Sequence, residues 1–448
     1  MKNKFILSGF AALSALATTA SADVTIDITG ATAFRTAAID AIIAAYGGTG
    51  SGTGLTDFAH TGTAASLSSL QGARQSIFRG NLTSDSPNQG IVTIRCTWTG
   101  SVEGIQTVGT QVTQDFLPVT ALDVAPPAGG AAPSGISLAH TQGTVSGVGN
   151  LAAGTELIIP DLAFSDVFPS SSPFDVSNVG DDIVGVVVFT MIANEGAPAG
   201  LTNVTGDQFR TLFSSGSKPL NYFFPTTDTR NVYATGRSDF SGTRTTYLAV
   251  TGFSDVVANK VSPAVQQWKP TLTGSANPTF EITTLRLWPT NDGNNRSLVW
   301  GTDLAGNGGF ESSSSLRTAF QGFSTNVTLQ DANGVFLSTE NLLLVSCFGI
   351  SDATTAVAGG AKALSYNGVG ITPANPLSAA DRAKITEGAY TLWGYQHLMH
   401  NSLNYPAATQ AVKTVLIGGI NSTTIGTAGI AFNLMNVSRN DDGATVAP

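Results

Sequence analysis

The stretch GRSDFSGTR, residues 236–244, gathers side chains that can bind an anion. Arg237 offers a planar guanidinium, Asp239 a carboxylate, and the serines, threonine and glycines offer hydroxyl donors and a backbone that a ligand can approach closely. The stretch follows NVYA and precedes the more regular TTYLAVTGF, which predicts that an extended segment passes here into a helix. A helix N-terminus presents unpaired N–H groups and a partial positive charge, so the pattern favours an anion site. The alternative is an ordinary helix start, capped by Ser or Asp, beside a surface arginine.

Two further segments place small polar residues between a strand and a helix. DVTIDITGATAFRTAAIDAIIAAYGG predicts a strand from Val24 to Ile28, a Gly-Ala-Thr turn and a helix that ends at Gly47. GIVTIRCTWTGSVEGIQTV repeats this order, with a strand from Ile91 to Trp98 and a turn over 99–101. Two such units predict an α/β sheet whose ligand lies beyond the carboxyl ends of the strands.

Other periodic segments predict the rest of the framework. DDIVGVVVFTMIAN indicates a continuous buried strand, which favours a central parallel or mixed sheet. TGDQFRTLFSSG predicts a capped helix that begins near Thr205 and ends before Gly216. KITEGAYTLWGYQHLMHNSL predicts a short strand and an amphipathic helix, with HLMH, residues 397–400, on the helix surface rather than in a metal site. Three aromatic residues of this region are interpreted as packing residues: Tyr390, Trp393 and Tyr395.

Composition narrows the functional classes. The chain has 448 residues, which predicts two lobes or domains, and 11% of them are charged. Its net charge of −9 argues against nucleic acid and against anionic membrane surfaces, both of which attract basic faces. It does not argue against a small anion held by local dipoles. The two cysteines, Cys96 and Cys347, could pair in an oxidising compartment or remain buried free thiols.

The first 22 residues, MKNKFILSGFAALSALATTASA, predict a secretory signal peptide. Lys2 and Lys4 precede a short apolar run, and Ala20-Ser21-Ala22 forms a small-residue cleavage site. We therefore expect a periplasmic or secreted protein whose mature chain begins near Asp23. No later apolar run is long enough to span a bilayer, so a membrane-embedded protein is not expected.

Taken together, these segments resemble the phosphate-binding proteins of bacterial ABC importers, which have the type II periplasmic binding-protein fold. RSDFSGT, Arg237 to Thr243, is similar to the family's motif except at Phe240, where the family usually has glycine. The turns TGATAF, TIRCTWTGSVEGI and LAFSDVFPS are similar to three other family turns, and GVVVFTMIAN, AGNGGF and EGAYTLWGY follow in the family's order. The resemblance covers most of the chain after residue 22.

This resemblance implies a two-lobed α/β fold with mixed sheets flanked by helices and a ligand cleft between the lobes. The first lobe would comprise residues 23–180 and 299–448, with an inserted loop region at 106–160. The second lobe would comprise residues 181–298, with two crossings as the hinge. The insertion contains VAPPAGGAAPSG and could form a lid, a partner surface or nothing ordered.

The resemblance also implies a set of phosphate ligands and no metal or other cofactor. Arg237 would pair with phosphate oxygens and be oriented by Asp239. Asp166 would accept the proton that hydrogen phosphate retains and would repel sulfate, which has none. Hydroxyls and backbone N–H groups would supply the other donors, although Thr32, Ser101 and Asp166 have the alternative of simple capping. The implied set is Thr32, Ala33, Phe34, Ser101, Asp166, Arg237, Asp239, Ser241, Gly242 and Thr243.

The predicted function is that of a monomeric solute-binding protein without catalytic activity. It would bind phosphate or a related oxyanion and deliver it to the membrane permease of an ABC importer. The alternative is a secreted surface or matrix protein that keeps this fold for a structural role or another ligand, favoured if Arg237 points to solvent or the insertion crosses the cleft. An enzyme is disfavoured because the sequence has no G-x-S-x-G elbow and no H-E-x-x-H motif.

Overall fold

The computed structural model describes residues 23–48, 54–61, 67–83, 90–122, 136–137, 156–253, 265–274, 280–290, 292, 304–420 and 429–448. The predicted signal peptide and the VAPPAGGAAPSG stretch of the predicted insertion lie outside these residues.

The first lobe is built on the two predicted strand–turn–helix units. β1 (Val24–Gly30) pairs in parallel with β4 (Val92–Thr97) and with β8 (Leu162–Ser165). Helices α1 (Arg35–Ala45) and α3 (Ser101–Thr110) follow β1 and β4. Residues 106–110 of the predicted inserted loop therefore belong to a helix. The other elements of this lobe are β2 (Leu55–Thr61), α2 (Leu67–Gly72), β3 (Gln75–Gly80), β5 (Gln114–Phe116), β6 (Ile136–Ser137), β7 (Glu156–Ile158), β19 (Trp393–Asn401), α10 (Ala407–Gly419) and β20 (Gly429–Ile430).

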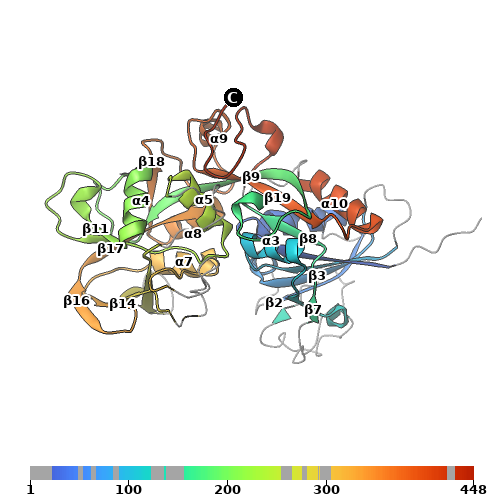
Figure 1. Cartoon of the computed structure of the whole chain (residues 1–448), viewed down its shortest axis with the longest axis horizontal. Helices are drawn as coiled ribbons and strands as arrows, with labels where there is room; N and C mark the ends of the chain where they lie inside the picture. The colour runs from blue at the N-terminus through green and yellow to red at the C-terminus, as the bar shows by residue number, and fades with distance from the viewer. Residues whose placement is uncertain are drawn as a thin grey trace, which may run out of the picture.

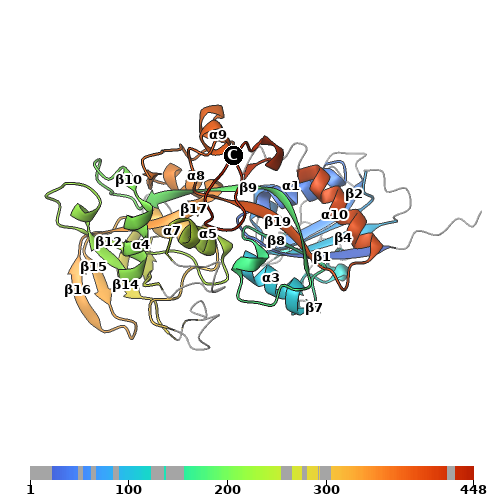
Figure 2. The same cartoon turned by 45° about the horizontal axis from the view of Figure 1, so that its top comes forward.

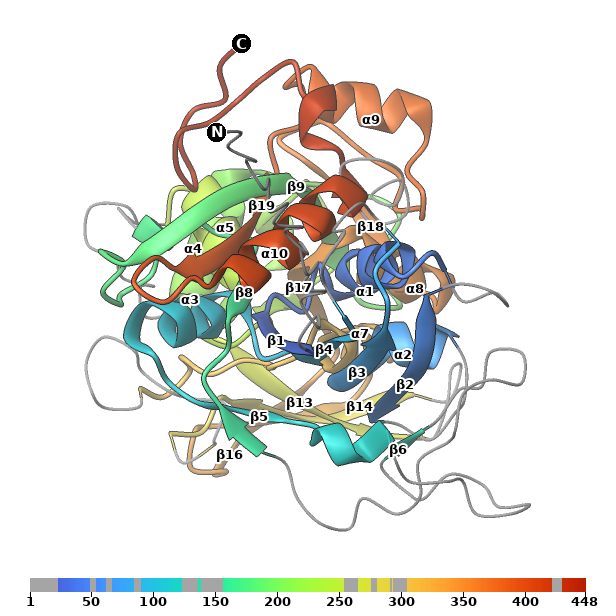
Figure 3. The same cartoon turned by 90° about the vertical axis from the view of Figure 1, so that its right-hand side faces the viewer.

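Helices cover both faces of the first lobe's sheet (Figure 2). α1 and α10 pack together on one face, where Ile42 and Leu416 join the main apolar core. Figure 3 shows these two helices on the same side of β1 and β4. α3 covers the opposite face and packs Val102 and Ile105 against Val167. Because both faces are covered, the carboxyl ends of β1, β4 and β8 are the part of the sheet from which polar turns can reach a ligand.

One long strand joins the two lobes. β9 (Val179–Ala193) pairs with β19 along Val179–Val188 and with β17 (Leu342–Gly349) along Phe189–Ala193. Figure 1 shows β9 running from one lobe into the other. From Val184 to Ala193 the strand is mostly apolar and buried on both sides, as predicted for a central strand, while Asp181 and Asp182 near its start are exposed.

The second lobe surrounds the far end of β9. β12 (Asn231–Ala234) pairs in parallel with β17, and β18 (Lys362–Tyr366) pairs with β9. α4 (Gly206–Ser215) is the predicted capped helix, with reciprocal Thr205–Gln208 hydrogen bonds at its start and Gly216 after its end. The other elements are β10 (Asn203–Val204), β11 (Ser217–Pro219), α5 (Gly242–Val250), α7 (Ser313–Phe320) and α8 (Ile350–Ala358). α9 (Ala379–Thr386) lies beside the C-terminal segment, at the junction of the lobes (Figure 1).

A four-stranded sheet, packed beside α7, corrects the predicted lobe division. Its strands are β13 (Trp268–Thr273), β14 (Glu281–Leu287), β15 (Val327–Gln330) and β16 (Phe336–Glu340). β15 pairs with β14, and β17 pairs with β12, so the chain does not return to the first lobe at residue 299. It returns with β19. Glycine-rich segments of the sequence indicated where helices and strands end. They did not indicate which strands pair, and strand pairing determines the lobe to which each segment belongs.

The segment predicted as an amphipathic helix near the C-terminus is instead β19. Its residues are almost all buried because β8 lies on one side of it and β9 on the other. HLMH is therefore strand, and His397 Nδ1 lies 2.9 Å from an Asp181 carboxylate oxygen. Tyr390 and Trp393 are buried packing residues, as predicted.

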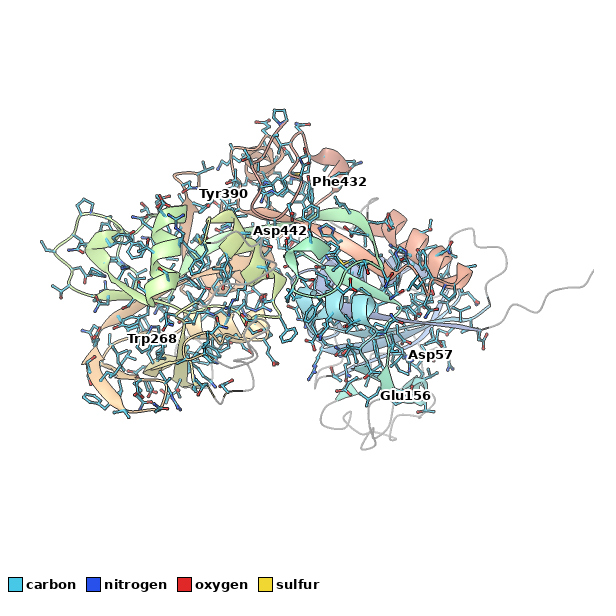
Figure 4. The ribbon with its side chains drawn as sticks, in the orientation of Figure 1. Asp57, Glu156, Trp268, Tyr390, Phe432 and Asp442 are labelled. Atoms are coloured by element: carbon cyan, nitrogen blue, oxygen red, sulfur yellow. The ribbon has the colours of Figure 1, made fainter. Side chains whose placement is uncertain are left out.

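The C-terminal residues 429–448 pack across the junction of the lobes. Asp442 accepts hydrogen bonds from the Phe168 N–H at 2.8 Å and the Ser171 hydroxyl at 2.6 Å, both in the first lobe. Gly443 has a φ of 76°, and a Cβ there would lie 2.6 Å from the Ala249 carbonyl oxygen of α5. Figure 4 places Asp442 between the lobes, next to Gly443, which lies against α5 of the second lobe.

Candidate functional site

Three polar turns of the first lobe meet the start of α5 in the second lobe. The turn after β1 provides Thr32, the first residue of α3, directly after the turn that follows β4, is Ser101, and the turn after β8 provides Asp166. From the second lobe, the loop between β12 and α5 provides Arg237, and the second residue of α5 is Thr243. We call these five residues the interlobe site. The Val102 N–H donates to the Phe240 carbonyl at 3.2 Å, so the starts of α3 and α5 are in direct contact.

Asp166 is the carboxylate of the interlobe site and is 1% exposed. The Ser101 hydroxyl donates to its Oδ1, and the Thr243 hydroxyl donates to its Oδ2 at 3.2 Å. Burial raises the pKa of Asp166, while these hydroxyls and the charge of Arg237 act in the opposite direction. One buried carboxylate is thus held by hydroxyl donors from both lobes.

Gly242 allows the two lobes to approach at Asp166. A Cβ at this position would lie 1.8 Å from Asp166 Oδ1 and 2.6 Å from Ser101 Oγ, which no side chain could tolerate. The requirement for glycine is therefore steric, and it keeps the first N–H groups of α5 next to the carboxylate.

Arg237 is also 1% exposed, and its guanidinium joins the lobes. It donates to the Phe310 carbonyl at 3.0 Å, to the Glu311 carbonyl at 2.6 Å and to the Thr32 hydroxyl at 3.3 Å, and it also contacts the Ser313 hydroxyl. Each of these acceptors is neutral. Among the residues that the structure describes, no carboxylate lies within ion-pair distance of Arg237. Burial lowers the pKa of Arg237, and the charge of Asp166 partly offsets this.

Asp239 does not orient Arg237, which corrects the expectation from the sequence. Its Oδ1 forms an ion pair with Arg244 at 2.6 Å, and its Oδ2 accepts from Asn307 at 3.0 Å. Arg244 also donates to the carbonyl and side-chain oxygens of Asn307, each at 2.7 Å. Arg244 is the third residue of α5, so its guanidinium can return to the loop that carries Asp239, whereas Arg237 extends toward Ser313 of α7.

Backbone donors surround the interlobe site. The N–H groups of Ala33 and Phe34, before α1, donate to no acceptor among the described residues. Gly242 and Thr243 are the first two residues of α5, so their N–H groups have no intrahelical partner. The Ser241 hydroxyl accepts from the Arg244 N–H at 3.4 Å and caps α5, which leaves its own proton available.

Three residues that contribute to this region were not singled out from the sequence. Arg244 ends the motif that drew attention to the site, and Asn307 lies between glycines in AGNGGF. Ser313 belongs to the serine run at the start of α7 and contacts Arg237. The two arginines of one motif were a usable signal, but the roles of Asn307 and Ser313 depend on contacts over 60 residues or more.

Other chemistries receive less support from the described residues. Cys96 and Cys347 are buried free thiols, and burial raises the pKa of each. Within the described part of the chain, no group of three or more His, Cys, Asp or Glu side chains could hold a metal ion. No helix in that part is long and apolar enough to cross a membrane.

Comparisons with solved structures find similar chain arrangements. An ABC-type phosphate transport receptor from Vibrio cholerae is 12% identical over 87% of this chain and 93% of its own, with a TM-score of 0.40. PstS from Borrelia burgdorferi is 10% identical over 90% and 94%, with a TM-score of 0.36. OxyR from Corynebacterium glutamicum is 8% identical over 91% and 67%, with a TM-score of 0.34. No family model and no curated protein matches the chain.

Proposed function

We propose that this chain is an exported, monomeric solute-binding protein that binds hydrogen phosphate between its lobes, without catalysis, and delivers it to an ABC importer. The observation that carries the proposal is Arg237, a buried guanidinium whose described partners are all neutral. A buried positive charge is costly unless an anion accompanies it. The unpaired N–H groups before α1 and at the start of α5 add donors around the same point.

Asp166 supports phosphate over other oxyanions. Hydrogen phosphate carries a proton that a buried carboxylate can accept, while its remaining oxygens accept from the surrounding donors. Sulfate would set two negative groups against each other with no proton between them. Asp239 is not among the proposed ligands, because it pairs with Arg244 and stabilises the loop. The proposed phosphate ligands are Thr32, Ala33, Phe34, Ser101, Asp166, Arg237, Ser241, Gly242 and Thr243.

The alternative of a structural surface protein would have been favoured by a solvent-facing Arg237. The side chain is buried instead, and it bonds across the two lobes. The other criterion for that alternative, an insertion across the cleft, concerns residues that lie largely outside the described part of the chain.

Calorimetric titration of the chain from Asp23 onward, freed of bound ligand by unfolding and refolding, tests the proposal. We expect phosphate to bind and sulfate to give no heat, and Arg237→Ala to abolish phosphate binding. Arg230→Ala is the matched control, because Arg230 lies in the same lobe but pairs with Asp228 at 2.7 Å outside the site. If phosphate gives neither heat nor a thermal shift, or if both variants lose binding equally, the proposal is wrong.

A further inference from the structure

A cavity of about 480 Å³ lies between the lobes, next to the interlobe site. Thr32 lines this side cavity and also accepts a hydrogen bond from Arg237, so the cavity and the interlobe site meet at that residue. Arg74 and Glu311, which also line the cavity, are exposed, whereas Arg237 is 1% exposed. The side cavity therefore connects solvent with the proposed phosphate position.

Arg35 is a half-buried arginine in the wall of the side cavity, and it has no ion-pair partner among the described residues. It is the first residue of α1, three positions after Thr32. Its Nε donates to the Gln71 carbonyl at 2.9 Å and its Nη1 to the Ala73 carbonyl at 3.4 Å, while its Nη2 donates to no described residue. Neutral acceptors thus hold the guanidinium at the cavity wall, and one of its nitrogens is left for a ligand.

Arg35 is one of three arginines whose charges act on one another at the junction of the lobes. Burial lowers the pKa of Arg35, the charge of Asp352 raises it, and the charges of Arg237 and Arg317 lower it further. Asp352 is the one carboxylate among these four groups, and it forms an ion pair with Arg317 at 2.8 Å. Positive charge therefore exceeds negative charge around Arg35, which attracts a small anion.

The start of α7 adds hydroxyl groups from the second lobe to the same wall. Ser312 and Ser314 both line the side cavity. Ser312 caps α7, because its hydroxyl accepts from the Ser315 N–H at 3.2 Å, and the Ser312 and Ser314 hydroxyl oxygens lie 3.0 Å apart. A hydroxyl proton can rotate toward an anion. With Thr32 of the first lobe, these serines provide hydroxyl donors in the cavity that Arg35 lines.

Three carboxylates in the wall prevent the side cavity as a whole from holding an anion tightly. Glu103 belongs to α3 and accepts from the Gln114 amide at 3.3 Å, Asp115 belongs to β5, and Glu311 precedes α7. Since α3 and α1 cover opposite faces of the sheet, Glu103 and Arg35 reach the cavity from different sides. An anion in the cavity is therefore attracted to Arg35 and repelled elsewhere, which suits a ligand in transit.

We propose, on the basis of the function above, that Thr32, Arg35, Ser312 and Ser314 form an outer anion position through which phosphate reaches the interlobe site. The position binds a small hydrated oxyanion weakly, through the guanidinium and the hydroxyl groups. The volume of the cavity corresponds to roughly sixteen waters at roughly 30 Å³ each, so phosphate fits together with part of its hydration shell. Arg35 then sets the rate at which phosphate arrives, and Arg237 sets how tightly it is retained.

Rapid mixing of the ligand-stripped chain with phosphate, followed by a fluorescent sensor of free phosphate, tests this inference. At about 0.01 M ionic strength, Arg35→Gln should lower the association rate constant about 3- to 10-fold. The equilibrium affinity should fall by a smaller factor, because phosphate passes the same position when it leaves. The difference in association rate should shrink at about 1 M salt, where the screening length is roughly 3 Å.

Arg74→Gln is the matched control, because Arg74 lines the same cavity but is exposed. We expect it to change the association rate less than about 2-fold. Equal slowing by Arg74→Gln and Arg35→Gln would show that the total charge of the cavity, rather than the outer anion position, determines arrival, and would overturn the inference. A loss of affinity in Arg35→Gln without slower association would make Arg35 a ligand of the retained phosphate, which also overturns it.

Ser314→Asp provides a second variant that should keep the fold. A carboxylate in the first turn of α7 is favourable for the helix, but here it places a negative charge in the cavity that Arg35 lines. The association rate should fall at least as much as in Arg35→Gln, with normal thermal unfolding. If phosphate binds and neither variant slows it, this inference fails and the proposed function stands. If the unaltered chain does not bind phosphate, the proposed function fails as well.

Discussion

Arg237 and Arg244 stand near the two ends of one loop and are equally buried, but their surroundings differ. Arg244 forms an ion pair with Asp239 and two further hydrogen bonds to Asn307. Arg237 donates to carbonyl and hydroxyl oxygens that carry no charge. Burial is therefore a poor guide to the role of a charged side chain, and the charge of its partners is a better one. We therefore infer that Arg244 stabilises the loop through Asp239, and that Arg237 can bind the proposed anion.

The largest expected effect is a loss of folding stability when Arg244 is replaced. Arg244→Met should lower the free energy of unfolding by about 3–5 kcal/mol, because it leaves the Asp239 carboxylate buried without its ion-pair partner. Adding Asp239→Asn to this variant should recover part of the loss. Urea unfolding measures both, and Arg237→Met should cost less than Arg244→Met. Equal costs for the two single variants would contradict the distinction between the arginines.

Arg237→Lys tests whether phosphate binding needs the guanidinium of Arg237 or only its positive charge. The lysine keeps a positive charge but loses the planar fork that can contact two oxygens of one anion. We expect phosphate affinity to fall by about 10- to 100-fold, measured by calorimetric titration. Arg230→Lys should change it little. Unaltered affinity in Arg237→Lys would show that charge alone, rather than guanidinium geometry, holds the ligand.

Asp166→Asn tests whether the Asp166 carboxylate lowers the stability of the ligand-free protein while it provides selectivity for phosphate. Because burial raises the pKa of Asp166 in the folded protein, its stabilising contribution is present at acidic pH and is lost as pH rises through the folded pKa. The neutral amide should therefore raise the melting temperature of the ligand-free protein at pH 7 by about 2 °C or more. It should also reduce the preference for phosphate over sulfate. A lower melting temperature with unchanged selectivity would remove Asp166 from its proposed role.

Asp442 gives a comparison outside the interlobe site, in which stability changes and phosphate binding does not. Burial raises its pKa to about 6, while the Ser171 hydroxyl bond acts in the opposite direction. The unfolded carboxyl titrates near 3.8, so the folded state holds this proton more tightly and loses stability as pH rises from about 4 to about 6. Relative to Asp442→Asn, the native protein should lose about 2–3 kcal/mol over that interval. Parallel unfolding curves of the two proteins at each pH would contradict this, and phosphate selectivity should not change.

Local features of the sequence predicted much of the framework. The alternation before Gly30, the capping residues around α4 and the long apolar run of β9 each depend on neighbours within a few residues. Local periodicity failed at β19, where aromatic and polar residues are buried together. A strand between two others can bury both of its faces, so its sequence need not alternate.

The sequence by itself determined the motif from Arg237 to Thr243 and the helix start that it forms, because the caps and glycines of a helix start act on adjacent backbone groups. Only the tertiary structure decided which side chains meet there. Thr243 reaches Asp166 across 77 positions, and Arg237 reaches Thr32 across 205. It also decided that Asp239 pairs with Arg244 and that the chain remains in the second lobe beyond residue 299. Such contacts depend on strand order and on the packing of the lobes, which local propensities do not encode.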